Sequence, residues 1–322
     1  MISVIGNVPV DLLAHVSDDF LAEHGLTKGV NTTISHDQQN RLLKATQYSV
    51  IPGGCGANVA ACMGLLKLPV QMIGSFGDDE YGAFALQALK DSGVHCYETP
   101  QKASTQIVFI FLTPDGDRSF AAFYDDETDV PVSELEAFLT TRPDGPVLLD
   151  GYKLLYPRYC DSIVNYVTGS LHDTVPFVMC PNDVGVIKAV PEAVKALYKR
   201  STHVVMNQME SDQLFSDHNL VNPLKNIQNN GKSGAITNGS RGAELFTPDR
   251  VIQVPSALDA ALFIDSNGAG DAFTAGYMYG VVHGLDLEEQ GKIASLCAAE
   301  VLAVDGARPG VELYPRVFKE PL

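Results

Sequence analysis

Short apolar runs alternate with segments of helical periodicity, and this alternation limits the possible folds of the chain more than any other feature. Six runs are short enough to be buried strands: Ser3–Ile5, Val70–Ile73, Val147–Leu149, Phe177–Met179, Val204–Met206 and Ala235–Thr237. Helical patterns cover residues 56–67, 80–92, 156–170, 188–200, 209–216, 221–230, 269–283 and 287–304. Because strand–helix–strand units make right-handed parallel pairs, we predict an α/β fold with a central, mostly parallel sheet covered by helices on both faces.

Residues 10–35 and 104–124 depart from this alternation. The first segment contains the short alternating stretch Val30–Ile34, and the second has a turn at Pro114–Asp117 between two apolar strands, which is a hairpin pattern. We expect both to pair into a small accessory sheet that acts as a lid over a site. An edge hairpin without a function fits the same pattern. No repeat or linker divides residues 1–322, so we predict a single domain.

The charge of the chain excludes several partners. The 322 residues carry a net charge of −17, which disfavours nucleic acid and anionic membrane surfaces. No stretch approaches 18 apolar residues, and the N-terminus lacks the pattern of a signal peptide, so we expect a cytoplasmic protein. The six cysteines are scattered, which indicates reduced thiols rather than disulfides or a zinc site. Any phosphate-bearing substrate needs local donors to overcome the acidic surface.

A glycine-rich segment precedes the predicted helix at 269–283. It reads Asp265-Ser266-Asn267-Gly268-Ala269-Gly270-Asp271-Ala272-Phe273. Its glycines allow N–H groups to approach a ligand closely, and a helix N-terminus favours a phosphate. Asp271 would lie in the first turn, where a carboxylate suits a general base that takes a proton from an attacking hydroxyl. Ordinary helix capping explains the same residues.

A second glycine pair opens the helix predicted over 56–67. Gly53 and Gly54 allow a close backbone approach, and Asn58 would project from the first turn, where its amide can both donate to and accept from a hydroxyl-rich substrate. Asp11 lies just beyond the first strand, at the edge where ligands bind in open α/β sheets, and could accept hydrogen bonds from a vicinal diol. A solvated turn aspartate is the alternative for Asp11.

Other polar residues follow later strands. Asn207 and Glu210 suit a water-mediated Mg²⁺ site beside phosphates, although these residues alone favour helix capping by Asn207 over a metal site. The small residues around Thr237 and Gly239 leave room for a nucleotide, or form a plain turn. Arg118, in the hairpin, could swing over the site and bind a phosphate in a bidentate manner.

Together these segments resemble the ribokinase family, the PfkB-type carbohydrate kinases, over nearly the whole chain. The elements occur in the family order: Gly6-Asn7…Asp11, Gly53-Gly54…Asn58, Ile73–Gly82, Asn207…Glu210, Thr237…Gly239…Gly242 and Asp265…Gly268–Asp271. Within the family, the chain is most similar to adenosine kinases. The similarity lies in the segments Gly6–Asp11, Asp19–Leu21 and Gly116–Ser119, and in the asparagine at position 267 of the second glycine-rich motif. The resemblance implies a ribokinase-like three-layer sandwich with a small β-sheet lid.

The resemblance also implies roles for the site residues. Asp11, Gly54 and Asn58, with Gly53 beside them, would bind the ribose hydroxyls, and Asn7 and Asn31 would lie near the nucleoside. Gly268, Ala269 and Gly270 would form the anion hole, Asp271 would be the base, and Arg118 would help to neutralise the moving phosphoryl group. Thr237, Gly239, Asn267 and Asn207 would line the ATP site. The cofactors implied are ATP and Mg²⁺, with K⁺ near the Asp265 backbone and the Asp305–Gly310 loop.

The identity of the acceptor depends on an element that departs from the adenosine kinase pattern. Those enzymes have an aromatic pair after a glycine near the fifth strand, and here Gly151 is followed by Tyr152 and Lys153. Thr33 also stands where an apolar contact to the base is expected. The resemblance still implies phosphoryl transfer to a primary hydroxyl of a ribonucleoside, with adenosine as the first expectation, and the departures leave other acceptors open. A sugar kinase of the fructokinase or ribokinase type is the alternative, and a non-catalytic nucleoside or sugar sensor is a third. Both a monomer and a lid-paired homodimer are compatible with the sequence.

Overall fold

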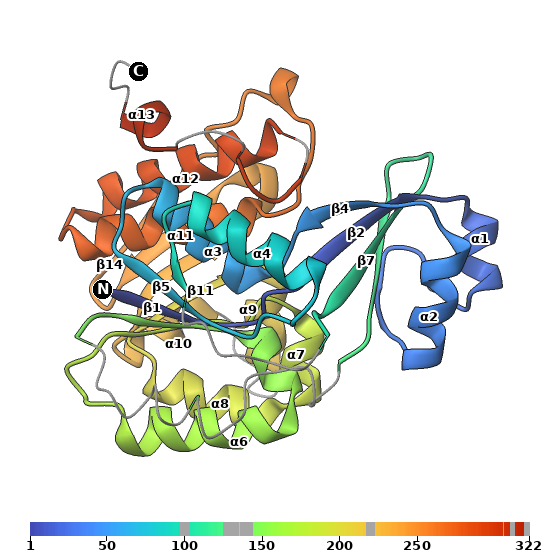
Figure 1. Ribbon diagram of the computed structural model, residues 1–322. Coiled ribbons are helices and arrows are strands. Elements are labelled where there is room, and N and C mark those ends of the chain that lie inside the picture. Colours follow the sequence, from blue (N-terminus) through green and yellow to red (C-terminus); the bar gives the residue numbers. More distant parts are fainter. Residues whose placement is uncertain are drawn as a thin grey trace.

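The computed structural model describes residues 1–96, 104–124, 135, 144–216, 223–304, 306–309 and 313–318 of the protein (Figure 1). These residues form a main body around a large sheet and a smaller layer that projects from one side of it. This architecture confirms the predicted α/β fold with flanking helices and a second, small sheet.

The large sheet contains nine strands within the described residues. They are β1 (Ile2–Ile5), β5 (Val70–Ile73), β6 (His95–Cys96), β9 (Val147–Asp150), β10 (Phe177–Cys180), β11 (His203–Asn207), β12 (Ser233–Thr237), β13 (Ala243–Thr247) and β14 (Arg250–Val254). Their order is β14-β13-β12-β11-β10-β9-β1-β5-β6. The strands from β12 to β6 are parallel, and β13 and β14 add an antiparallel edge. The six predicted strands are therefore confirmed.

Side chains of the parallel strands alternate between two hydrophobic cores, one on each face of the sheet. In β10, Val178 belongs to one core, while Phe177 and Met179 belong to the other. The same division separates Leu148 from its neighbours in β9. Because successive side chains of a strand point to opposite faces, these continuous apolar runs cover both faces. Each core is closed by a layer of helices.

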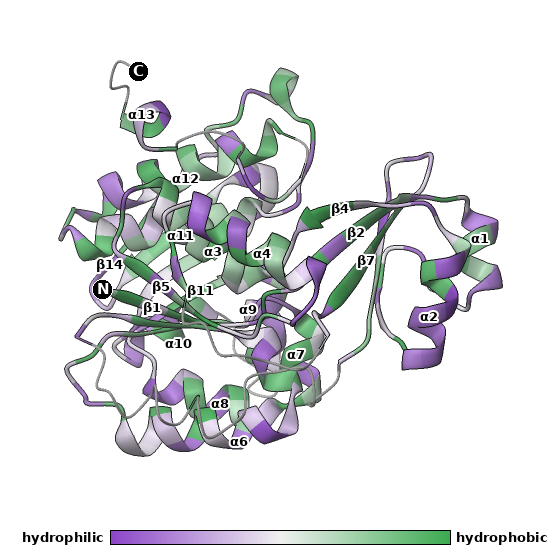
Figure 2. Cartoon of the chain, viewed as in Figure 1, coloured by the Kyte–Doolittle hydropathy of each residue, from purple (hydrophilic) through white to green (hydrophobic). Residues whose placement is uncertain are grey.

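The first helical layer contains α3 (Cys55–Leu65), α4 (Glu80–Asp91), α11 (Ala269–Val282) and α12 (Leu287–Leu302), and short α13 (Leu313–Phe318) lies against it. The second layer contains α6 (Pro157–Asn165), α7 (Val184–Ala189), α8 (Pro191–Arg200), α9 (Gln208–Leu214) and α10 (Pro223–Asn229). Figure 1 shows the two layers on opposite sides of the sheet. Most residues of α3 and α11 are buried, and both helices are predominantly apolar. Figure 2 colours the chain by hydropathy and shows green ribbon in the layer that contains them.

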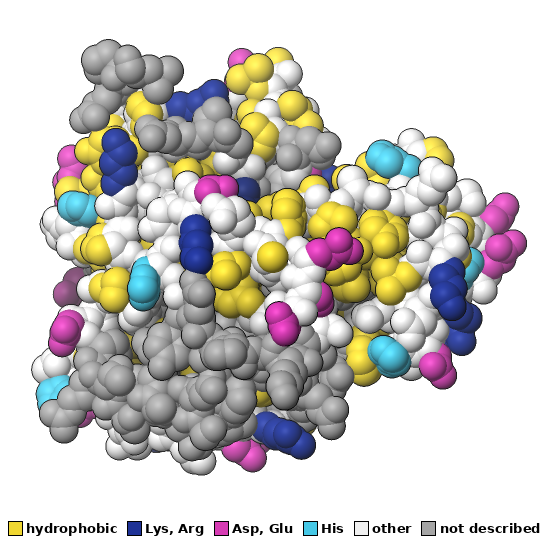
Figure 3. Space-filling view, viewed as in Figure 1, with side chains coloured by type: hydrophobic (Ala, Val, Ile, Leu, Met, Phe, Trp, Pro, Cys, Tyr) yellow, Lys and Arg dark blue, Asp and Glu magenta, His cyan; other side chains and the backbone are white. Residues whose placement is uncertain are grey.

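The small sheet has the strand order β3-β8-β7-β2-β4. Its strands are β2 (Val10–His15), β3 (Asn31–Thr33), β4 (Ser49–Pro52), β7 (Ile107–Leu112) and β8 (Arg118–Ala122), and we call it, with α1 (Asp18–Glu23) and α2 (His36–Ala45), the lid. The predicted hairpin is confirmed: β7 and β8 are antiparallel around a turn in which Gly116 has φ +86°. In Figure 3, hydrophobic side chains gather where the lid joins the main body.

Several sequence predictions differ from the structure in detail. The helix predicted over 188–200 is two helices, because Pro191 lacks an N–H group and starts α8 at its first turn. The segment 156–170 contains α6 followed by a π-helical turn over Tyr166–Ser170. Strand β4, helices α1 and α2, and the edge strands β13 and β14 were not predicted. Residues 221 and 222 of one predicted helix lie outside the described residues.

Asp79 connects the lid to the main body. Its Oδ1 accepts a hydrogen bond from the N–H of Gly82 at 2.8 Å and caps α4. Its Oδ2 accepts from the N–H of Thr105, also at 2.8 Å, where the chain enters β7. One carboxylate therefore links the start of a main-body helix to the base of the lid.

Two further features concern membrane spans and the cysteines. Within the described residues, no helix has both the length and the apolar character that a membrane span requires. All six cysteines are free thiols, five of them buried.

Candidate active site

Polar residues gather where the parallel strands of the main sheet end. Asn7 follows β1, Asp150 ends β9, Asn182 and Asp183 follow β10, Asn207 ends β11, and Thr237 ends β12. The chain leaves β1 toward β5 on one side and returns to β9 on the other, so the strand order reverses between β1 and β9. Open α/β sheets bind ligands at such a reversal, outside the carboxyl ends of the strands.

Helices α3 and α11 both begin at this edge. Each is preceded by a glycine in the left-handed region: Gly54 has φ +87° and Gly268 has φ +75°. A Cβ atom on Gly268 would lie 2.3 Å from the carbonyl oxygen of Ala307, so both the backbone angle and the space require glycine there. The free N–H groups and positive ends of the two helices are thereby directed at one region, which favours an anion.

The side chains of Asn58 and Asp271 join the two helices. Asn58 Nδ2 donates to Asp271 Oδ2 at 3.0 Å. The pKa of Asp271 is raised to about 7. Burial is the main cause and the charge of Asp150 adds to it, while the Asn58 hydrogen bond, the charge of Arg308 and a hydrogen bond with Cys55 act in the opposite direction. A carboxylate whose pKa lies near neutrality is well matched to general base catalysis.

Two cavities lie on either side of this pair. The lid-side cavity, of about 290 Å³, is lined from the lid and from the strand ends, and Asn58 belongs to it. The sheet-side cavity, of about 320 Å³, is lined by Asp271, Gly270, Asn207, Glu210, Thr237 and Gly239. Cys55 and Asp150 line both. The Asn58–Asp271 pair therefore lies at the junction of two spaces that can hold two different small molecules.

Most residues expected to bind an acceptor line the lid-side cavity: Asn7, Asp11, Asn31, Gly54, Asn58 and Tyr152. Asn267 also lines this cavity, although it was expected at the nucleotide site. Asn267 precedes the left-handed Gly268, so it lies before the turn into α11. Among the described residues, Thr33 is exposed and does not line the cavity.

Asp11 does not lie in the turn after the first strand, as the sequence suggested. It is the second residue of β2 in the lid, paired with Ile51 of β4 and Val108 of β7. The position is still in the cavity, and the side chain is 6% exposed. Burial raises the pKa of Asp11 to about 7, and the charge of Arg308 opposes the shift.

Gly53 makes room for Asp11. A Cβ atom on Gly53 would lie 2.1 Å from Asp11 Oδ1, so only glycine lets the carboxylate reach its place. Gly53 also donates its N–H to the carbonyl oxygen of Pro9 at 3.2 Å, which connects the loop before α3 to the loop before β2. The glycine pair therefore positions a lid carboxylate against the start of α3.

Asp150 stabilises the floor between the two cavities. It accepts hydrogen bonds from the N–H groups of Gly56 at 3.1 Å and Tyr152 at 3.0 Å. Gly6 and Gly56 pack against it so closely that a Cβ atom on either would lie 3.0 Å from Asp150 Cβ. Burial raises the pKa of Asp150 to about 6, while the backbone N–H groups oppose the shift. Asp150 holds the starts of α3 and of the 3-10 turn Gly151–Leu155 together.

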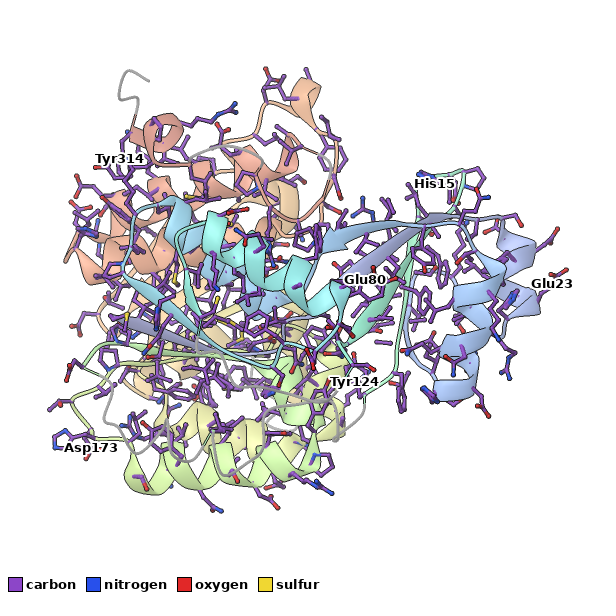
Figure 4. The ribbon with its side chains drawn as sticks, in the orientation of Figure 1. His15, Glu23, Glu80, Tyr124, Asp173 and Tyr314 are labelled. Atoms are coloured by element: carbon purple, nitrogen blue, oxygen red, sulfur yellow. The ribbon has the colours of Figure 1, made fainter. Side chains whose placement is uncertain are left out.

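Aromatic rings form part of the lining of the lid-side cavity. Tyr152 donates its hydroxyl to Asp183 at 3.1 Å, and Tyr124, from the end of the lid hairpin, lines the same wall. Figure 4 shows Tyr124 where the lid meets the main body. Lys153 is buried elsewhere, with its Nζ 4.4 Å from the ring centroid of Tyr159 and its pKa lowered to about 7 by burial. Lys153 therefore does not take a place in the cavity, and Tyr124 supplies a second ring.

Asn207 and Glu210 form a capping box at the start of α9. Asn207 Oδ1 accepts from the N–H of Glu210 at 2.9 Å, and Glu210 Oε2 accepts from the N–H of Asn207 at 3.0 Å. Glu210 Oε1 accepts from Asn207 Nδ2 at 2.7 Å, and burial raises the pKa of Glu210 to about 7. The capping explanation for Asn207 is thus confirmed. Within the described residues, no group of three or more His, Cys, Asp or Glu side chains could hold a metal ion.

Arg118 forms an ion pair with Asp265, which is 2% exposed at its side chain. The same carboxylate accepts from the N–H groups of Asn267 at 2.8 Å and Gly306 at 3.0 Å. The lid arginine therefore contacts the loop that leads into α11, and among the described residues it lines neither cavity. Asp305 and Gly310, expected near a potassium ion, lie outside the described residues.

Four residues of the site were missed. Asp150 directly follows one predicted strand and Asp183 lies a few residues beyond another, so the rule applied to Asp11 could have found them. Tyr124 ends the predicted hairpin, but nothing local places it in a cavity. Arg308 lies in the loop between α12 and α13, with Nε 2.8 Å from Asn58 Oδ1 and Nη2 3.0 Å from the carbonyl oxygen of Gly53. An arginine in a Gly- and Pro-rich loop is a weak signal.

Known proteins share this sequence pattern and this fold. The family model described as pfkB family carbohydrate kinase matches residues 28–313. Ribokinase of Bacillus subtilis is 24% identical over 284 residues, which cover 88% of this chain and 92% of the relative. Probable fructokinase-5 of Arabidopsis thaliana is 24% identical over 288 residues, covering 84% and 88%.

The structural neighbours include an adenosine kinase. The adenosine kinase from Sinorhizobium meliloti aligns with a TM-score of 0.85 at 24% identity, covering 99% of this chain and 98% of that one. A probable sugar kinase from Rhizobium etli aligns with a TM-score of 0.88 at 23% identity, covering 99% and 97%. At these identities the structural likeness establishes the fold. The family match over most of the chain establishes more: the protein belongs to the pfkB family of carbohydrate kinases, transferases that phosphorylate a hydroxyl group.

Proposed function

We propose that this protein is an ATP-dependent kinase that phosphorylates the primary hydroxyl of a ribonucleoside, with adenosine as the preferred acceptor and Asp271 as the general base. One observation carries the proposal: the Asn58–Asp271 pair lies between a lid-side cavity and a sheet-side cavity, at the N-terminus of α11. The acceptor would bind in the lid-side cavity and the nucleotide on the sheet side.

The chemistry follows from that arrangement. Asp271 takes the proton of the acceptor hydroxyl as the oxygen attacks the γ-phosphorus of ATP, and the bond to the leaving ADP breaks. The N–H groups of Gly268, Ala269 and Gly270 at the start of α11 stabilise the charge on the transferring phosphoryl group. Phosphoryl transfer depends mainly on such positioning and electrostatic stabilisation.

The lid-side cavity suits a nucleoside because its lining is both polar and aromatic. Asp11, Asn58 and Gly54 line it, and the carboxylate and the amide among them can bind ribose hydroxyls. Tyr152, Tyr124 and Phe120 supply aromatic surface that a planar base can cover. A free pentose or hexose would leave that surface uncovered.

The charges of the lid-side cavity favour an unphosphorylated acceptor. Asp11, Asp150 and Asp183 line it, and no Lys or Arg does so among the described residues. A sugar phosphate would therefore meet carboxylates in a cavity that has no cationic side chain in its described lining to bind the phosphate. Neutral acceptors, which include nucleosides and free sugars, fit this field.

Mg²⁺ would arrive with the nucleotide, because this ion binds phosphates, waters and few protein ligands. Asn207 and Glu210 line the sheet-side cavity and could contact its water shell, although their oxygens already serve the capping box. Bound there, Mg²⁺ would neutralise phosphate charge. A potassium ion near Asp265 would use backbone carbonyls, since both carboxylate oxygens of Asp265 are bonded within the protein.

A second candidate is a sugar kinase, because the relatives of this chain include a ribokinase and a fructokinase. A panel of adenosine, inosine, guanosine, ribose, fructose and ribose-1-phosphate with MgATP, with and without K⁺, separates the candidates. We expect the highest kcat/KM with adenosine. A preference for fructose or ribose would establish the sugar kinase, and ligand binding without ATP turnover would establish a sensor.

The variant Asp271→Asn tests the base. We expect its kcat to fall by at least ~10²-fold, the usual contribution of a general base, while the nucleotide still binds. Turnover near the wild-type value would remove Asp271 from the mechanism.

A further inference from the structure

Arg308 contacts both the glycine loop before α3 and the amide that faces the base. Its Nε donates to Asn58 Oδ1 at 2.8 Å, and its Nη2 donates to the carbonyl oxygen of Gly53 at 3.0 Å. Asn58 then donates from Nδ2 to Asp271 Oδ2 at 3.0 Å. Three residues from three separate parts of the chain thus form a continuous hydrogen-bonded series that ends on the carboxylate.

We propose that Arg308 is a positioning residue for phosphoryl transfer, which fixes the orientation of the Asn58 amide and through it the carboxylate of Asp271. The proposal rests on the assignment of Asp271 as the base.

The orientation of Asn58 follows from the donors around it. Arginine carries only donors, so the atom of Asn58 that faces Arg308 must be the carbonyl oxygen. The amide NH₂ then faces Asp271, where it donates to the carboxylate. A flipped amide would place two donors together at Arg308 and two acceptors together at Asp271. The guanidinium therefore selects the one rotamer in which Asn58 can hold Asp271.

The second contact joins Arg308 to the loop beside Asp11, which lines the lid-side cavity. Gly53, whose carbonyl oxygen it binds, lies directly against Asp11. One guanidinium thus restrains the loop that supports Asp11 and the amide that supports Asp271. Arg308 therefore links the contacts of Asp271 with those of Asp11, although it lies in a separate loop, between α12 and α13.

The charge of Arg308 acts on the same two groups. It lowers the pKa of both Asp11 and Asp271 against the larger effect of burial. Burial lowers the pKa of Arg308 itself to about 10, so the guanidinium is charged at neutral pH, and the neighbours Cys62, Asp11, Asp271 and Cys96 oppose that shift. The other groups that affect the pKa of Asp271 are Cys55 and Asn58 on α3 and Asp150 on β9.

A purely structural role explains this arginine poorly. Its Nη1 is buried and has no hydrogen-bond partner among the described residues. A buried donor without a partner costs free energy, and a desolvated cation costs more. An apolar side chain of similar length would fill the space without either cost, so the guanidinium is better explained by what it does to Asn58 and Asp271.

The test compares Arg308→Lys and Arg308→Met with wild type, using the acceptor of highest kcat/KM. We expect Arg308→Met to lower kcat about tenfold to a hundredfold and to move the acidic limb of the pH profile of kcat/KM to higher pH. Arg308→Lys keeps the charge but cannot keep both hydrogen bonds. It should therefore lose kcat while its pH profile stays near that of wild type.

Arg316→Met is the matched control, because Arg316 makes an exposed ion pair with Glu300 at 2.7 Å near the same end of the chain. It should match wild type in kcat and pH profile. Thermal unfolding and the Kd for ATP show whether each Arg308 variant is folded. If Arg308→Met does not fold, Arg308→Lys decides through its kcat.

Unchanged kcat and pH profile in folded Arg308 variants would overturn the proposal while leaving the base intact. Full turnover by Asp271→Asn, measured alongside, would instead overturn the proposed function.

Discussion

The guanidinium of Arg118 in the lid is paired with the buried carboxylate of Asp265 in the main body. Asp265 also accepts N–H hydrogen bonds from Asn267 and Gly306, so its oxygens are shared by a lid residue and two loops beside the start of α11. The position of the lid and the shape of the loop that leads into α11 are therefore coupled through one side chain.

Replacing Arg118 with Met should destabilise the protein more than replacing an exposed arginine. Asp265 would lose its cation while staying buried, and we expect the free energy of unfolding to fall by about 1–3 kcal/mol. Urea unfolding monitored by circular dichroism measures the change. Arg316→Met, which removes an exposed pair, should cost less than about 1 kcal/mol. Equal losses in the two variants would show that the Arg118–Asp265 pair has no special weight.

Activity should depend steeply on pH below neutrality. Asp271 and Asp11 both have pKa values raised to about 7. The proposed base must be ionised to take a proton, and Asp11 is a stronger acceptor of hydroxyl hydrogen bonds when it is ionised. As the pH falls through 7, kcat/KM should drop about tenfold per pH unit for one group, and more steeply for two coupled groups. A profile between pH 5.5 and 8.5 measures this slope.

The variant Asp11→Asn separates the two ionisations. It leaves Asp271 as the remaining titrating carboxyl of the pair, so the acidic limb should approach a single tenfold change per pH unit. If kcat/KM of the folded wild-type protein stays constant down to pH 5.5, the roles assigned to Asp11 and Asp271 are both contradicted.

The two glycines of the proposed anion hole should respond differently to replacement by alanine. Gly268 has φ +75° and almost no space for a Cβ atom, so Gly268→Ala should lower the melting temperature and kcat together, with a backbone cost of about 1–2 kcal/mol. At Gly270, a Cβ atom would have no heavy atom within 4 Å, and the residue lines the sheet-side cavity. Gly270→Ala should therefore fold normally and raise the KM for ATP. Steady-state kinetics and thermal melts distinguish these results from a uniform loss of stability.

Tyr152 should contribute to nucleoside binding through its ring more than through its hydroxyl. Tyr152→Leu removes a stacking surface of about 1–3 kcal/mol and should raise the KM for adenosine about tenfold to a hundredfold. Tyr152→Phe keeps the ring, loses the bond to Asp183 and should change KM only a few-fold. If both variants behave like wild type with adenosine, the base does not bind at this wall.

The local features of the fold could be read from the amino-acid order. Val147–Leu149 and Phe177–Met179 formed the predicted strands because buried parallel strands are continuous apolar runs. Gly268 and Asp271 lie at the predicted helix start, with the glycine in the left-handed region and the carboxylate in the first turn. Both features depend on only a few adjacent residues, so the sequence can predict them. The family order of these motifs then predicted the reaction class.

The composition of the site depended on which distant segments pack together. Asp11 was expected after β1 and lies in the lid, because β2 pairs with β7 and β4, far along the chain. Lys153 follows Tyr152 in the sequence yet is buried away from the cavity, and Tyr124 takes a place beside Tyr152.

The sequence by itself determined the six predicted strands, the glycine-rich helix starts and the place of Asp271 in the first turn of α11, because each depends on the conformations of neighbouring residues. Only the tertiary structure decided that Arg308 binds Asn58, 250 residues away, and that Arg118 binds Asp265. Such contacts arise when crossovers and loop packing bring remote segments to one edge of the sheet. No local periodicity records that convergence.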